Sequence, residues 1–246
     1  MTWIPPIFLF TDYVANDKRP LYPWNSNRDQ LMDLSNKEIE VFYSYRSPYS
    51  YLAIGQLYDW HRKTGVNIII RPVYPLAIRT PDFFDRLNPL GHAYVLMDTK
   101  RTAEFLNLDY KWPNPDPVNM TFSPLNIPKE QPYIHRLTRL GIESVLQGKS
   151  LEFTYAVSSL IFNANVDDWT ESNHLELAIS QAGLELANMD EAIDNDTKKY
   201  DDLIQKNQKD HSTSGHWGVP LMVYKGEPFF GQDRIAILKW RVEKSD

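Results

Sequence analysis

The sequence contains no cysteine among its 246 residues. A chain without thiols forms no disulfide, holds no thiolate-bound metal and runs no dithiol redox cycle of its own. Its six histidines are scattered, and His211 and His216 are not at the four-residue spacing that pairs two side chains on one helix face. We therefore predict no zinc site and no other metal centre.

The sequence also lacks a net positive charge and long apolar runs. The formal net charge is −6, which argues against the clustered basic side chains of a nucleic-acid-binding surface. No stretch approaches the roughly 20 apolar residues of a membrane helix. The apolar run near the N-terminus lacks a basic leader, so we expect it to pack against the domain. We predict a cytoplasmic protein that binds neither nucleic acid nor membrane.

Strand and helix signals begin at residue 38. A β-branched and aromatic run predicts a strand at 39–43, and the run at 67–71 predicts another. Between them, the segment from Tyr49 to Trp60 is typical of a helix, with Gly65 as its stop signal. A strand–helix–strand unit of this length places its two strands parallel to each other.

The remaining pattern is helical in the middle and returns to strands at the end. Five helices are expected at 94–105, 133–146, 151–162, 175–182 and 189–204. A strand at 219–224, a tight turn and a short antiparallel partner at 228–230 then precede a last helix that begins near Asp233.

This order predicts the α/β class, as a thioredoxin-like fold (βαβ…ββα) with a large all-helical insertion. We divide the chain into an N-terminal arm (1–37), a thioredoxin-like domain (38–83 and 210–246) and the helical insertion (84–209). We expect the arm to wrap around the body.

The turn before the first helix reads Ser47-Pro48-Tyr49-Ser50. Serine is a favoured helix N-cap and proline a favoured first helical residue, so capping alone explains the motif. A helix N-terminus also stabilises a thiolate, and this turn is where a thioredoxin-like fold carries its reactive cysteine pair. Ser47 and Ser50 occupy both cysteine positions. A serine hydroxyl cannot be oxidised, but it can donate a hydrogen bond to the sulfur of a bound thiol.

Two later segments complete a candidate site. Pro220 either opens an edge strand or forms a cis bond with Val219, which would turn the Val219 backbone toward the Ser47 turn for pairing with a peptide ligand. Asp233 either caps the last helix or faces the ammonium group of a ligand. A thiol site, a pairing edge and an amino-acid clamp outline a γ-glutamyl-cysteinyl ligand.

Three motifs carry a family resemblance: FYSYRSPYSYLA at 42–53, GVP at 218–220 and FGQDR at 230–234. They resemble motifs of the 2-hydroxychromene-2-carboxylate isomerases, which are relatives of the kappa-class glutathione transferases in the DsbA-like superfamily. The resemblance implies that Ser47 faces the sulfur of glutathione and that Val219, before Pro220, pairs with its cysteinyl backbone. It further implies that Gln232 and Asp233 hold the γ-glutamyl end.

We therefore predict a glutathione-dependent isomerase in which Ser47 stabilises the thiolate of its cofactor, glutathione. Two alternatives are a kappa-like glutathione transferase and a non-catalytic thioredoxin-like module that binds peptides at the Val219 edge. The expected partner is a small electrophilic or aromatic molecule. We leave open whether the chain forms a homodimer.

Overall fold

The computed structural model describes residues 32–85, 88–122 and 125–245. Most of the expected N-terminal arm lies outside these residues. Its described end packs on the body, because Leu34 is buried and its N–H donates to the carbonyl of Thr64 over 2.8 Å. No helix in the described ranges is long and apolar enough to cross a membrane.

A mixed four-stranded sheet forms the centre of the molecule, in the order β2-β1-β5-β6. Its strands are β1 (Glu38–Tyr43), β2 (Asn67–Pro72), β5 (Leu221–Tyr224) and β6 (Glu227–Phe230). β1 and β2 are parallel, whereas β5 pairs antiparallel with both β1 and β6. The predicted parallel unit and the predicted C-terminal hairpin are both confirmed.

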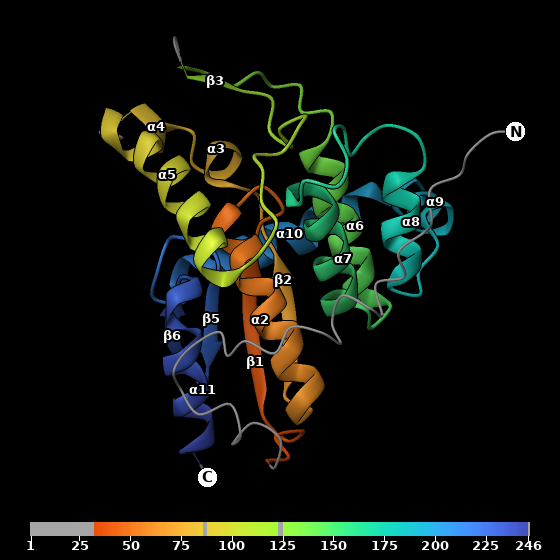
Figure 1. Cartoon of the computed structure of the whole chain (residues 1–246). Helices are drawn as coiled ribbons and strands as arrows, with labels where there is room; N and C mark the ends of the chain where they lie inside the picture. The colour runs from red at the N-terminus through yellow and green to blue at the C-terminus, as the bar shows by residue number, and fades with distance from the viewer. Residues whose placement is uncertain (1–31, 86–87, 123–124, 246) are drawn as a thin grey trace, which may run out of the picture.

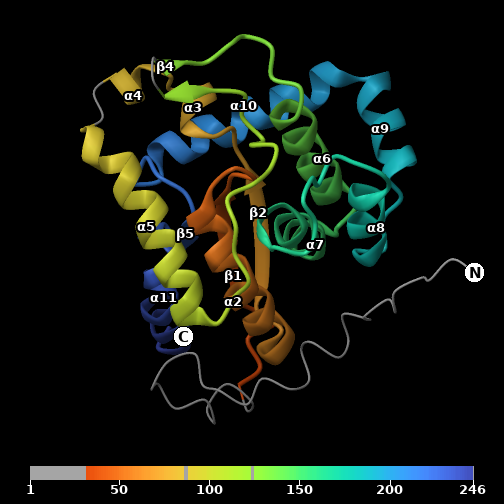
Figure 2. The same cartoon turned by 45° about the horizontal axis from the view of Figure 1, so that its top comes forward.

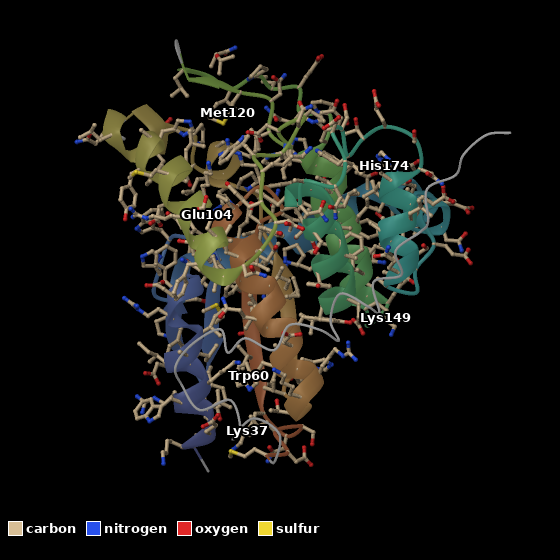
Figure 3. All side chains as sticks on the ribbon, in the orientation of Figure 1. Lys37, Trp60, Glu104, Met120, Lys149 and His174 are labelled. Atoms are coloured by element: carbon tan, nitrogen blue, oxygen red, sulfur yellow. The ribbon has the colours of Figure 1, made fainter. Side chains whose placement is uncertain are left out.

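Helices α2 (Pro48–Thr64) and α11 (Ile235–Glu243) lie side by side along the sheet (Figures 1 and 2). α2 begins at the predicted cap Ser47 and ends at Gly65. The face of α2 that points inward is buried. Trp60 lies fully buried in the second half of the helix, at the end of the molecule opposite Met120 (Figure 3). The start of α2 therefore lies at the opposite end of the sheet from Lys37.

The segment between β2 and β5 is mainly helical. It contains a two-stranded hairpin and the following helices: α3 (Leu76–Arg79), α4 (Asp82–Asp85), α5 (Pro89–Leu106), α6 (Ile134–Leu146), α7 (Ser150–Phe162), α8 (His174–Gln181), α9 (Leu186–Asn195) and α10 (Thr197–Thr213). The hairpin pairs β3 (Thr121–Phe122) with β4 (Leu125–Asn126). α5 and α7 pack on α2, and α6 and α7 pack on β2. α8 and α9 lie against α7 and α6, on the side away from the sheet (Figure 2).

The single helix expected at 189–204 is wrong. The chain forms two helices, α9 and α10, which meet at Asp196. Asp196 has a non-helical backbone, and its carboxylate accepts a hydrogen bond from the N–H of Lys199 over 3.2 Å. An aspartate that caps a new helix ends the preceding one, although the apolar periodicity continues across the break.

The start of the last helix contradicts one of the two predictions for Asp233, namely that it caps this helix. A 3-10 turn, η1 (Gln232–Arg234), leads into α11, and Asp233 lies inside this turn rather than ahead of the helix. Its side chain makes no capping bond and instead pairs with Arg234 at 2.8 Å. The capping role of Asp233 is therefore wrong, and its carboxylate is exposed to solvent.

Candidate functional site

The turn between β1 and α2 presents the hydroxyl of Ser47 at a helix N-terminus. The Ser47 Oγ accepts a hydrogen bond from the N–H of Ser50 over 3.2 Å, as expected of an N-cap. The first turn of α2 carries no acidic side chain that would offset the partial positive charge of the helix end. Ser47 is partly exposed, so this hydroxyl is accessible to a ligand.

The two serines of the motif are not equivalent. The Ser50 side chain is fully buried, and its Oγ has no hydrogen-bond partner among the described residues. Ser47 is the one of the two that solvent and a ligand can reach. The turn therefore offers one hydroxyl to a bound sulfur rather than two.

Val219 lies directly against this hydroxyl. The Val219–Pro220 peptide bond is cis, which confirms the second reading of that motif. The Ser47 Oγ donates to the carbonyl of Val219 across 3.4 Å, although the two residues are far apart in the sequence. Within the described residues, the N–H of Val219 donates to no protein group. Its backbone is thus open to pairing with an extended ligand.

Side chains from α3 and α10 hold the segment that precedes Val219. The Arg79 guanidinium donates to the carbonyl of Trp217 over 2.7 Å, and His211 donates from Nε2 to the carbonyl of Gly218 over 3.0 Å. The N–H of Gly218 donates to Nδ1 of His216 over 2.9 Å. Burial lowers the pKa of Arg79 to about 10 and lowers the pKa of both histidines.

The Gln232–Asp233 turn lies next to this segment. The N–H of Gly231 donates to the carbonyl of Pro220 over 3.0 Å, and η1 packs against α2. Gln232 is half-buried and Asp233 is exposed. The structure thus joins Ser47 to Val219 directly, and joins the Gln232–Asp233 turn to them through Pro220.

Helix α5 lies against the same end of α2 and is tied to it by a network of polar side chains. The Tyr49 hydroxyl donates to the Asp98 carboxylate over 2.8 Å. Arg101 donates to Asp98 and to the hydroxyl of Tyr94, each over 2.8 Å. Burial raises the pKa of Tyr49, and the hydrogen bond to Asp98 adds to this effect. Burial opposes ionisation of Asp98, but hydrogen bonds from Tyr49 and Arg101 hold its pKa below the ordinary value.

Arg46, directly before Ser47, does not point a free charge at the site. Its guanidinium forms a two-pronged pair with the Asp116 carboxylate, with contacts of 2.9 and 3.1 Å, and lies 5.1 Å from the centre of the Trp112 ring. Asp116 also accepts from Trp112 Nε1 and from the N–H of Val118. Arg46 therefore anchors the 107–118 segment over the Ser47 turn, and its charge is balanced by Asp116.

Several of these residues were missed from the sequence. Arg79 and His211 have no local motif, because their partners lie far away in the chain. Tyr49 lies in the motif at 42–53, but its partner Asp98 could not be predicted. His216 could have been found from the sequence, because a histidine two residues before Gly218 can accept a hydrogen bond from the Gly218 N–H. For metals, the described part of the chain contains no group of three His, Cys, Asp or Glu side chains arranged to hold an ion.

Fold and site together define a thioredoxin-like protein whose turn between β1 and α2 carries two serines, in a chain without cysteine. The chain belongs to the DSBA-like thioredoxin domain family, whose model matches residues 38–243. Among curated proteins, none matches this sequence.

Solved structures share the fold at low sequence identity. A 2-hydroxychromene-2-carboxylate isomerase aligns with a TM-score of 0.61 and 16% identity, over 84% of this chain and 95% of its own. A probable DsbA oxidoreductase from Streptomyces coelicolor aligns at 0.58 and 15%, over 85% and 89%. The cytosolic disulfide reductase DsbM from Pseudomonas aeruginosa with GSH aligns at 0.53 and 12%, over 84% and 99%.

Proposed function

We propose that this protein binds glutathione at the Ser47 turn and uses it as the cofactor of an isomerase. The observation that carries the proposal is the contact between the Ser47 hydroxyl and the carbonyl of Val219, at the N-terminus of a helix. A thiol held there meets a hydroxyl donor and a helix dipole, which both favour its ionised form. The family resemblance of the three motifs and the fold shared with a 2-hydroxychromene-2-carboxylate isomerase support this choice.

The residues present fit the parts of glutathione. The open N–H of Val219 and its carbonyl match the backbone of a cysteinyl residue, which would add to the sheet edge as a short strand. The exposed Asp233 carboxylate matches the γ-glutamyl ammonium group, and the half-buried Gln232 lies beside it. That one structure of this fold is described with GSH is consistent with the assignment.

When bound, glutathione supplies a thiolate that adds reversibly to a conjugated double bond. The part of the protein in such a reaction is to hold the sulfur ionised through Ser47 and to hold the peptide through Val219. Aromatic side chains near the turn, Tyr49, Tyr94 and Trp112, suit a flat aromatic substrate. A transferase would use the same sulfur site and keep the substrate attached, so product analysis separates the two activities.

A peptide-binding module without catalysis is the second candidate. Two exposed aromatic residues beside Val219 favour it, since Trp217 and Phe230 have ring centres 6.2 Å apart and could pack on apolar ligand side chains. This module would bind unrelated extended peptides as well as glutathione, whereas the proposed enzyme would prefer glutathione.

Binding measurements test the proposal directly. Glutathione should stabilise the folded protein by about 2.7 kcal/mol at a hundredfold excess over its dissociation constant. Calorimetry and thermal unfolding should be carried out with glutathione, S-methylglutathione and an unrelated tripeptide. Preference for glutathione supports the proposal, and equal affinity for the tripeptide favours the peptide module. No heat and no thermal shift at millimolar glutathione would exclude glutathione as the cofactor.

A further inference from the structure

The hydrogen bond between His216 and Gly218 depends on the charge of the imidazole. The backbone N–H of Gly218 donates to Nδ1 of His216 over 2.9 Å, so Nδ1 must carry no proton. A protonated imidazole has donors on both nitrogens and cannot accept this bond. The neighbouring contact is different, because His211 donates from Nε2 to the Gly218 carbonyl and keeps that donor in either charge state.

The same imidazole contacts two segments of the candidate site, the one before Val219 and the strand β6. Its ring stacks on Phe230, with centres 3.7 Å apart and planes 17° from parallel. Phe230 is the last residue of β6 and leads directly into the Gln232–Asp233 turn. Gly218 lies so close to the ring of Phe230 that any side chain there would collide with it. His216 thus contacts the segment that carries Val219 and the strand that carries the Gln232–Asp233 turn.

The surroundings of His216 oppose a positive charge. Its other ring neighbours are Trp217, at 5.2 Å between centres, and Phe230. Among the described residues, the titratable side chains that hydrogen-bond to this segment from other elements are His211 and Arg79, and neither is acidic. Burial lowers the pKa of His216 below its ordinary value of about 6.5, so the neutral form predominates at pH 7.

We propose that neutral His216 is a positioning residue that holds Gly218, and through it the Val219 edge, in the ligand-binding arrangement, and that protonation of His216 releases this segment and weakens ligand binding. The glutathione part of this proposal rests on the proposed function. If the protonated protein does not bind, the apparent affinity falls about tenfold one pH unit below the midpoint of the His216 titration.

The first test uses the free protein. In nuclear magnetic resonance spectra recorded between about pH 4.5 and 7.5, the amide signal of Gly218 should shift with the same midpoint as the ring of His216. In the His216→Asn variant this shift should vanish, because an asparagine oxygen can accept from the N–H two residues ahead but does not titrate in this range. A Gly218 amide that does not follow the His216 ring would overturn the positioning role.

The second test measures glutathione affinity by calorimetry between about pH 5 and 7, where the charge of glutathione itself changes little. The wild type should weaken as the pH falls, and His216→Asn should keep near wild-type affinity across the range. His216→Phe keeps a stacking ring but has no acceptor, so it should bind roughly threefold to tenfold more weakly at every pH, with a flat profile.

The outcomes separate the two proposals. If His216→Asn retains the full pH dependence of the wild type, the inference is wrong even though glutathione binds. If no variant binds glutathione at any pH, the proposed function fails and the ligand half of the inference fails with it. The Gly218 titration in the free protein then still supports or overturns the positioning role.

Discussion

At the scale of single residues, the proposed function depends on the Ser47 Oγ and its hydrogen bond to a bound thiolate. The Ser47 Oγ accepts from the N–H of Ser50 and directs its own proton at the Val219 carbonyl across 3.4 Å. That second contact is long for a hydroxyl donor. A negatively charged sulfur is a stronger acceptor than a distant carbonyl, so a bound thiolate would take over this proton. The capping reading and the functional reading of Ser47 are therefore compatible.

Asp233 gives a prediction at the same scale. Its carboxylate is proposed to meet the γ-glutamyl ammonium of the ligand, in a charge-assisted contact of about 1.5–3 kcal/mol. Asp233→Ala should therefore weaken glutathione binding more than it weakens binding of the dipeptide Cys-Gly, as measured by calorimetry. Because Asp233 caps no helix, the free energy of unfolding should change by less than about 0.5 kcal/mol.

Arg234→Gln is the matched control for this change. It removes the ion pair with Asp233 but keeps the carboxylate. Glutathione affinity should stay close to that of the wild type. If both variants lose the same affinity, or if Asp233→Ala affects glutathione and Cys-Gly equally, the clamp is excluded.

At the scale of elements, α5 is held to the start of α2 by the Asp98 carboxylate. The partner of Asp98 could not be predicted from the sequence, because Tyr49 lies in another helix. The hydrogen bond from Tyr49 joins α5 to the start of α2, and Arg101, which lies on α5 itself, holds the Asp98 carboxylate in place for it. Helix position and site geometry are therefore coupled through one side chain.

Replacing this carboxylate should lower stability in a pH-dependent way. A hydrogen bond to a charged group contributes about 1.5–3 kcal/mol, and partial exposure of Arg101 screens its share, so Asp98→Asn should cost about 1.5 kcal/mol near pH 6. Since the folded protein lowers the pKa of Asp98, this stabilisation is present above the unfolded value of about 3.9 and is lost as the pH falls through the lower folded pKa.

Urea unfolding of both proteins between about pH 2.5 and 7 measures this difference. The two free energies of unfolding should differ near pH 6 and converge below about pH 4. Glu104→Gln, which removes an exposed carboxylate from the same helix (Figure 3), should show no comparable difference. A loss for Asp98→Asn that is constant down to pH 2.5 would contradict the account.

At the scale of the whole molecule, the fold could be predicted because its signals are local. β-branched runs, the Ser47-Pro48 start and the Gly65 end specify the strand–helix–strand unit directly. The boundary at Asp196 was missed because apolar periodicity outweighed a capping aspartate in the prediction. The loop supports from Arg79 and His211 could not be predicted, since only the folded chain brings them to residues 217 and 218.

The absence of cysteine gives a prediction for the molecule as a whole. Solved structures with this fold include a probable oxidoreductase and a disulfide reductase, but this chain has no sulfur nucleophile of its own. It should not accelerate the reduction of insulin disulfides beyond the rate of glutathione alone. Turbidity assays with a dithiol thioredoxin as positive control measure this, and a clear acceleration would contradict the proposed role.

The most direct test of the account is the ionisation of glutathione bound at Ser47. A free thiol ionises near pH 8.5. A hydrogen bond worth about 1.5–3 kcal/mol to the thiolate should lower that pKa by roughly one to two units. Thiolate absorbance in the ultraviolet, recorded against pH with saturating glutathione, should therefore show a higher thiol pKa for Ser47→Ala than for the wild type.

Ser50→Ala provides the control, because its hydroxyl is buried and has no partner among the described residues. The account predicts that the Ser50→Ala and wild-type titration curves coincide, while the Ser47→Ala curve moves to higher pH. If the Ser47→Ala and wild-type curves coincide instead, Ser47 is only a helix cap and the proposed role in thiol activation is contradicted.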